Sequence, residues 1–106
     1  MRRKDGDKMV MAKYADELTY TYGNAKDYVD TFLEEDVISF DLLIQKRGSV
    51  FDVAVSFYYW EEDVLTSKRD DKLSVDFLTD SEAVNYSSAL EHFLSQVRPV
   101  SVLNEL

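Results

Sequence analysis

The chain has 106 residues, no cysteine and 45% hydrophobic residues, which together predict a single folded domain. The absence of cysteine excludes a disulfide framework, a thiolate zinc site and a cysteine nucleophile. Residues 16–106 carry seven basic and nineteen acidic side chains, a net charge of −12, whereas residues 1–15 carry five basic and two acidic ones. An acidic body of this kind repels nucleic-acid phosphates and attracts basic protein surfaces.

The first eight residues are mostly charged, and we predict that residues 1–8 form a flexible basic tail on a single acidic domain spanning residues 9–106. The basic start is followed by charged residues rather than by the apolar run of a signal peptide. No stretch approaches the ~18 consecutive apolar residues of a membrane span. We therefore expect a soluble, cytoplasmic protein that makes no membrane contact.

Residues 11–22 fit two patterns. Apolar side chains recur at helical spacing at Met11, Tyr14, Ala15, Leu18 and Tyr22. The segment 18–22 also alternates as a strand does and contains strand-favouring residues. The sequence favours a helix over residues 10–20, and a strand stays open as the alternative.

A second helix is predicted to begin after Gly23 and Asn24, because asparagine is a good N-cap residue. One side of this helix is apolar and consists of Ala25, Tyr28, Val29, Phe32 and Leu33. The opposite side carries Asp27, Asp30 and Glu34, and the helix is predicted to end near Glu34, Glu35 and Asp36. Acids at a helix C-terminus oppose the macrodipole, so this end is a place to look for function.

The clearest pattern is a β-hairpin between Val37 and Asp63, in which apolar and polar residues alternate on both sides of a Gly-containing turn. A loop formed by residues 46–49 would place apolar residues opposite one another on one face. The predicted pairs are Ile44 with Phe51, Leu42 with Val53, Phe40 with Val55 and Ile38 with Phe57.

Beyond this hairpin we predict brief further pairing at residues 64–66, an exposed charged loop at residues 67–72 and a third strand at residues 73–77. Thr79 and Glu82 have the spacing of a capping box. The final helix must end before Pro99. Its core-facing stripe is predicted to comprise Ala83, Tyr86, Ala89, Leu90, Phe93, Leu94 and Val97.

The predicted fold is an α+β two-layer sandwich in the order α-α-β-β-β-α, with two helices on one face of a three-stranded antiparallel sheet. The last residues include Val100, Val102, Leu103 and Leu106, and this apolar tail is expected to pack back on the domain.

No sequence motif for catalysis is found. The chain lacks nucleophile-elbow, zinc-protease, P-loop and dinucleotide-binding patterns, and its acids do not have the spacing of a calcium loop. The single histidine, His92, lies near the polar face of the final helix and is expected at the surface. We therefore expect no enzymatic activity, no cofactor and no metal ion.

The outward face of the predicted sheet is a candidate binding surface. In the predicted register Asp41, Asp52 and Asp76 form an acidic patch flanked by Tyr58 and Trp60. An ordinary solvated sheet face is the alternative, and it stays open.

The element order invites comparison with the double-stranded RNA-binding domain, but that domain reads phosphates with a basic start to its last helix. Here the corresponding residues, from Thr79 to Glu82, include two acids and no basic residue, so direct nucleic-acid binding is not expected. In size, charge and layout the chain is similar to the small acidic anti-restriction and anti-CRISPR proteins of phages. That resemblance implies an inhibitor that acts as a nucleic-acid mimic.

We therefore predict a protein-binding module that occupies a basic, nucleic-acid-binding surface of a partner protein. Three alternatives stay open: an immunity protein or antitoxin that blocks a toxin's active site, a homodimeric adaptor, and acidity that serves only solubility. The predicted partner-binding residues are Asp27, Asp30, Glu34, Glu35, Asp36, Asp41, Asp52, Tyr58, Trp60, Glu61, Glu62 and Asp76.

Overall fold

A computed structural model describes residues 13–106 of the chain. The predictions for the basic tail and for residues 9–12 lie outside these residues. A first helix includes residues 13–22 and is followed by α2 (Ala25–Phe32), β1 (Val37–Arg47), β2 (Val50–Glu61), β3 (Val64–Arg69), β4 (Val75–Phe77), α3 (Asp80–Ser95) and β5 (Val100–Asn104).

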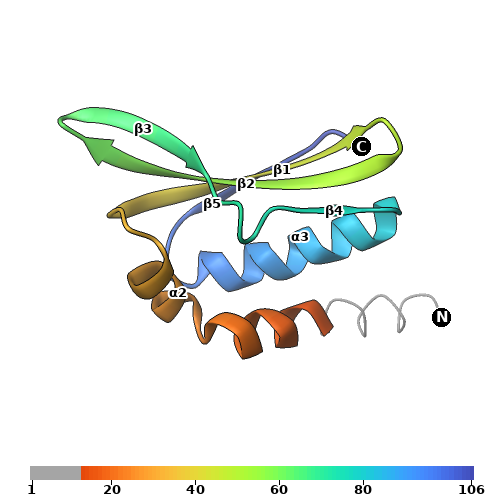
Figure 1. The fold of residues 1–106 in the computed structure, drawn as a ribbon, viewed down its shortest axis with the longest axis horizontal. Coiled ribbons are helices and arrows are strands. Elements are labelled where there is room, and N and C mark those ends of the chain that lie inside the picture. Colours follow the sequence, from red (N-terminus) through yellow and green to blue (C-terminus); the bar gives the residue numbers. More distant parts are fainter. Residues whose placement is uncertain (1–12) are drawn as a thin grey trace.

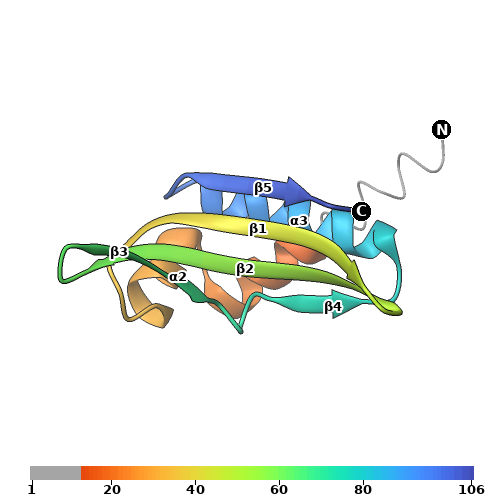
Figure 2. The same cartoon turned by 90° about the horizontal axis from the view of Figure 1, so that it is seen from above.

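The elements form two layers, with the sheet above and the helices below in the view of Figure 1. The predicted α+β two-layer sandwich is therefore confirmed. The predicted three-stranded antiparallel sheet is wrong in detail, because the sheet is mixed and has five strands in the order β3-β2-β1-β5, with β4 pairing on β2 beside β3. Among the described residues no helix covers the upper face of the sheet (Figures 1 and 2).

The helices α2 and α3 begin directly after their predicted N-cap residues, Asn24 and Thr79. Residues 13–22 are helical, so the strand alternative is wrong for this part of the chain. The Asn24 side chain accepts a hydrogen bond of 2.8 Å from the Asp27 backbone N–H, which confirms the predicted N-cap of α2. At α3 the Thr79 hydroxyl accepts from the backbone N–H of Glu82 at 3.2 Å, and it also contacts the Glu82 carboxylate at 3.0 Å.

The core lies between the sheet and the helices, and the predicted apolar faces form it. The inward side chains of the two long strands are buried; they are Phe40, Leu42, Ile44, Val53, Val55, Phe57 and Tyr59. The predicted stripe of α3 is buried as well, apart from Val97, which is partly buried at the edge of the core. Burial of such apolar surface is the main favourable contribution to folding.

The predicted hairpin exists, but its register differs by two residues. The turn consists of Gly48 and Ser49 alone, with Gly48 at a φ of +62°, so Ile44 faces Val53 and Phe40 faces Phe57. A two-residue turn whose first central residue has positive φ is typical of type II′ and favours glycine at that position. Because side chains alternate with period two, the predicted faces are correct from Ser39 onward although the predicted partners are wrong. At Ile38 the predicted face is wrong as well, because a register shift between Val37 and Ser39 places Val37 on the buried face instead.

The predicted charged loop at residues 67–72 is only partly a loop. Residues 67–69 belong to β3, which pairs antiparallel with β2. The chain then turns into the core, where Asp70 and Leu73 are buried, and returns to the sheet edge as β4. Asp70 tolerates burial because its carboxylate accepts hydrogen bonds from the Tyr28 hydroxyl and from the backbone N–H of Lys72.

The apolar tail packs on the domain as an edge strand, which the sequence analysis did not predict. β5 pairs in parallel with β1, with Phe40 opposite Val100 and Ile44 opposite Asn104. The Arg98 side chain donates a hydrogen bond of 2.7 Å to the Val37 carbonyl and ties the start of β5 to the start of β1. Within residues 13–106, no helix combines the length and apolarity needed to cross a membrane.

Candidate functional site

The observed register separates the acids that the sequence placed in one patch. Asp41 lies opposite Ser56, whereas Asp52 lies opposite Gln45 on one side and Asp76 on the other. Asp41 and Gln45 are four residues apart on one strand, a distance of about 13 Å. The predicted single patch is therefore wrong, and its members belong to two different regions of the upper face.

The first region is an acid pair at the β1–β2 turn. Asp52 is only 1% exposed, and its Oδ2 lies 3.4 Å from Arg47 Nε and 3.2 Å from Gln45 Nε2. Asp52 Oδ1 is buried and accepts no hydrogen bond from the described residues. The contact with Asp52 raises the pKa of the half-exposed Asp76 above its usual 3.8, while Arg47 opposes this shift. The carboxylates of Asp52 and Asp76 contact each other and Arg47, so they are poorly placed to bind a basic partner.

The second region is a hollow of about 340 Å³ in the middle of the upper face. The Tyr58 hydroxyl donates a hydrogen bond of 2.7 Å to the Asp41 carboxylate, and this bond raises the tyrosine pKa. Small side chains leave the hollow open; they are Ala54, Ser56, Ser67 and Ser101. Asp41 and Tyr58 thus form a fixed polar pair within a shallow depression.

The largest group of acids outside these regions lies at one end of the molecule, which we call the acidic end. It consists of Glu34, Glu35 and Asp36 from the α2–β1 connection and Glu61, Glu62 and Asp63 from the β2–β3 turn. Both segments lie at the same end of the elongated fold in Figures 1 and 2.

Strand pairing brings the two segments near each other, because Val37, which follows Asp36, pairs with Tyr59, two residues before Glu61. Burial raises the pKa of the Tyr59 hydroxyl, and the carboxylates of Glu61 and Glu35 raise it further. One of these carboxylates comes from the α2–β1 connection and the other from the end of β2, although 26 residues separate them in the chain.

Exposed apolar side chains accompany the acidic end. Trp60 is 61% exposed and lies opposite Leu65, which is 51% exposed, so the two side chains share the upper face of the hairpin. Val64 is 63% exposed and lies opposite Glu61. In Figure 1 this hairpin extends beyond the helical layer, which explains why its side chains are not covered.

The turn at the tip of this hairpin has a backbone that its residues disfavour. Glu62 and Asp63 have φ values of +48° and +67°. Two central residues with positive φ are typical of a type I′ turn, where Asn-Gly is the preferred pair. A glutamate in this conformation costs about 1–2 kcal/mol. The acids at the tip are therefore present in spite of the local backbone preference.

The remaining predicted acids lie on α2, and they differ in their surroundings. Asp30 forms an exposed ion pair of 2.6 Å with Lys26, whereas Asp27 stands in the first turn and helps to complement the helix dipole. α2 ends at Phe32, so Glu34, Glu35 and Asp36 lie beyond the helix rather than in its last turn.

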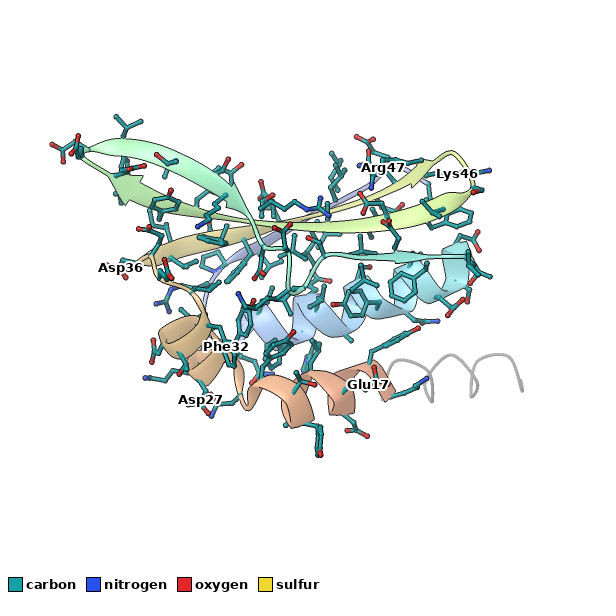
Figure 3. The ribbon with its side chains drawn as sticks, viewed as in Figure 1. Glu17, Asp27, Phe32, Asp36, Lys46 and Arg47 are labelled. Carbon is teal, nitrogen blue, oxygen red and sulfur yellow. The ribbon has the colours of Figure 1, made fainter. Side chains whose placement is uncertain are left out.

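The opposite end of the molecule carries basic side chains. Figure 3 labels Lys46 and Arg47 beside the β1–β2 turn and Asp36 at the far end of β1. The molecule is 50 Å long, so the two ends are well beyond the Debye length of about 8 Å at physiological salt. At the β1–β2 turn, however, the charge of Arg47 is offset by its contacts with Asp52 and Asp76.

Trp60, Glu61 and Glu62 were predicted from the sequence to bind a partner, whereas Val64 and Leu65 were not. The sequence did contain a signal for this pairing. If Glu62 and Asp63 alone form the turn between β2 and β3, Leu65 lies directly opposite Trp60. His92 is exposed on α3, as expected. In the part of the chain that the structure describes, no three acidic or histidine side chains lie close enough to hold a metal ion.

No protein family, curated protein sequence or solved structure matches this chain significantly. A function must therefore be proposed from the surface of the molecule alone.

Proposed function

We propose that this protein is a non-enzymatic inhibitor whose acidic end occupies a basic, nucleic-acid-binding surface of a partner protein. The observation that carries the proposal is the β2–β3 turn. Glu62 and Asp63 occupy positions where asparagine and glycine would be more stable, at an exposed tip beside an exposed tryptophan. Residues that reduce stability without a structural benefit are expected where a function requires them.

The composition of the acidic end supports a protein partner rather than a small ligand. Trp60 and Leu65 provide an apolar contact of the kind that dominates the energy of protein interfaces. The surrounding carboxylates provide long-range attraction toward a basic surface and increase the rate of association. Carboxylates presented along such a surface stand where the phosphates of a nucleic acid would lie.

The proposal is tested with the immobilised full-length protein and a cell lysate at about 50 mM and 500 mM salt, a range over which charge contacts to nucleic-acid-binding sites weaken strongly. We expect nucleic-acid-binding proteins to be retained at low salt and released at high salt. Duplex DNA added at low salt should release the same proteins, because it competes for their basic surface.

Two variants make the test specific to the hairpin. Trp60→Ala should reduce retention about tenfold or more, as expected for loss of an interface tryptophan. Tyr20→Ala is the matched control, since Tyr20 is 94% exposed but lies on the first helix. Equal retention by the two variants, or proteins that DNA does not release, would contradict the proposal.

A further inference from the structure

The two edges of the sheet differ in how they are protected from pairing with another strand. The edge formed by β3 and β4 carries Lys68 and Arg69, and the excursion at residues 70–74 interrupts it. Charged residues and interruptions are common devices that prevent edge-to-edge association. β5 has neither, because residues 101–104 read Ser-Val-Leu-Asn and are all exposed and uncharged.

The hydrogen bonds between β5 and β1 show which backbone groups of β5 have no partner among residues 13–106. The Phe40 N–H donates to the Pro99 carbonyl at 2.9 Å, and the Glu105 N–H donates to the Ile44 carbonyl at 2.8 Å. In a parallel pair only alternate residues bond to the neighbouring strand. The odd-numbered residues of β5 therefore face β1, and the N–H and C=O groups of Val100, Val102 and Asn104 face the open edge.

We propose that this edge is a homodimer interface, in which β5 of a second copy pairs antiparallel with β5 about a twofold axis at Val102. In this register Val102 faces its own copy, Val100 faces Asn104 and Ser101 faces Leu103. All the free groups then meet a partner, which gives roughly six main-chain hydrogen bonds. The edge is therefore complementary to itself, as a twofold interface requires.

The charges of the protein are compatible with this arrangement. Glu105 of one copy lies opposite Pro99 of the other, which keeps the two Glu105 side chains about 20 Å apart along the strands. The twofold axis reverses the direction of β1, so the two acidic ends lie at opposite ends of the joined sheet. Both separations exceed the Debye length of about 8 Å at physiological salt.

A second copy fits this edge better than a charged peptide does. The edge offers no side-chain charge for such a peptide to contact, and its exposed Val102 and Leu103 match those of an identical strand. The interface is separate from the acidic end, so its existence does not depend on the proposed inhibitory function. A dimer would present two acidic ends, one at each extremity.

The test is the mass of the full-length protein in solution, measured by sedimentation equilibrium over a range of concentrations. The wild type should change from monomer to dimer as the concentration rises. Val102→Pro should remain a monomer, because proline removes an N–H that faces the open edge and none that faces β1. Ser67→Pro, at an edge-facing position of β3, is the matched control and should dimerise like the wild type.

A second pair of variants tests the register and does not depend on proline being tolerated. Val102→Glu and Val102→Lys each place like charges directly opposite one another in the proposed dimer, so each alone should be monomeric. Mixing the two should restore a dimer that contains one copy of each. A monomeric wild type at all concentrations, or a Val102→Glu variant that dimerises like the wild type, would overturn the proposal.

Discussion

The carboxylate of Asp70 is an acid that the fold uses for its own stability. It is buried and accepts hydrogen bonds from the Tyr28 hydroxyl and from backbone N–H groups of the segment that enters the core. Burial and the neighbouring carboxylate together raise the pKa of Tyr28 above its usual 10.0. A buried carboxylate that loses a donor is costly, so this pair should couple α2 to the sheet.

Replacing Tyr28 with phenylalanine tests this coupling. We expect Tyr28→Phe to lower the free energy of unfolding by about 1–3 kcal/mol, because Asp70 keeps its burial and loses a donor. The measurement is urea unfolding at neutral pH, with Tyr20→Phe as the exposed control, which should change nothing. A Tyr28→Phe variant as stable as the wild type would show that the hydroxyl contributes no net stability.

The pH dependence gives a second measure of the same residue. A raised pKa in the folded state means that the stability due to Tyr28 is complete below pH 10.0, the usual tyrosine value, and is lost as the pH rises through the raised value. The decline in stability above pH 10 should therefore be shallower in Tyr28→Phe than in the wild type. A loss of packing alone would not change this slope.

At the scale of elements, the β2–β3 hairpin combines stability costs with exposure. Its turn has an unfavourable backbone, and its tip carries three acids and the exposed side chains of Trp60, Val64 and Leu65. Each of these features could be replaced without touching the core. The hairpin is therefore the element where a stabilising change and a functional loss are expected to coincide.

The variant Glu62→Asn with Asp63→Gly should separate these two effects. Asparagine and glycine suit a type I′ turn, so we expect the free energy of unfolding to rise by about 1–2 kcal/mol. Retention of nucleic-acid-binding proteins should fall, because two carboxylates are lost from the tip. Denaturant unfolding and the retention assay are the two measurements.

The control variant for the turn is Glu62→Gln with Asp63→Asn, which removes the same charges without introducing glycine. It should match the loss of retention and show a smaller gain in stability. If the Glu62→Asn, Asp63→Gly variant is more stable and retains partners as well as the wild type does, the acids at the tip do not contribute to partner binding.

The elements also show what the sequence could predict. Alternation identified the inward faces of β1 and β2, but it could not fix their register, because a shift of two residues leaves every face unchanged. Only the turn decides the register, and the sequence allowed both a four-residue and a two-residue loop. The predicted contact between the neighbourhoods of Asp41 and Asp52 depended on that choice and was lost with it.

The sequence predicted only the first half of β3, at residues 64–66, and did not predict β5, for related reasons. β3 is an exposed edge strand whose charged residues hide any alternation. β5 pairs with a strand that precedes it by about 60 residues, and no local pattern reports such a pairing. The burial of Asp70 likewise depends on Tyr28, which is 42 residues away, so a charged stretch gave no sign of it.

For the whole molecule, the question is whether the acidity has a binding role or serves only solubility. Net charge acts on solubility almost regardless of its position, whereas a binding site depends on where the carboxylates stand. The structure separates these possibilities spatially. The acidic end holds three of its six acids, Glu61, Glu62 and Asp63, on the same hairpin as Trp60, while Asp16 and Glu91 are exposed on the first helix and α3.

Two variants of equal charge therefore distinguish the roles. Glu61→Gln with Glu62→Gln and Asp16→Asn with Glu91→Gln each make the net charge of −9 less negative by two. We expect equal, small decreases in solubility, measured by precipitation with ammonium sulfate. We expect the first variant alone to lose retention of nucleic-acid-binding proteins at low salt, because only its changes lie at the acidic end.

Each outcome of this comparison shows whether retention of partners depends on net charge or on the position of the acids. If both variants lose retention equally, the attraction comes from net charge and the acidic end has no special role. If neither loses retention, the partner contacts another surface, and the hollow at Asp41 and Tyr58 is the next one to change. Loss in the first variant alone, together with the effect of Trp60→Ala, would place the interface on the β2–β3 hairpin and its neighbouring connection.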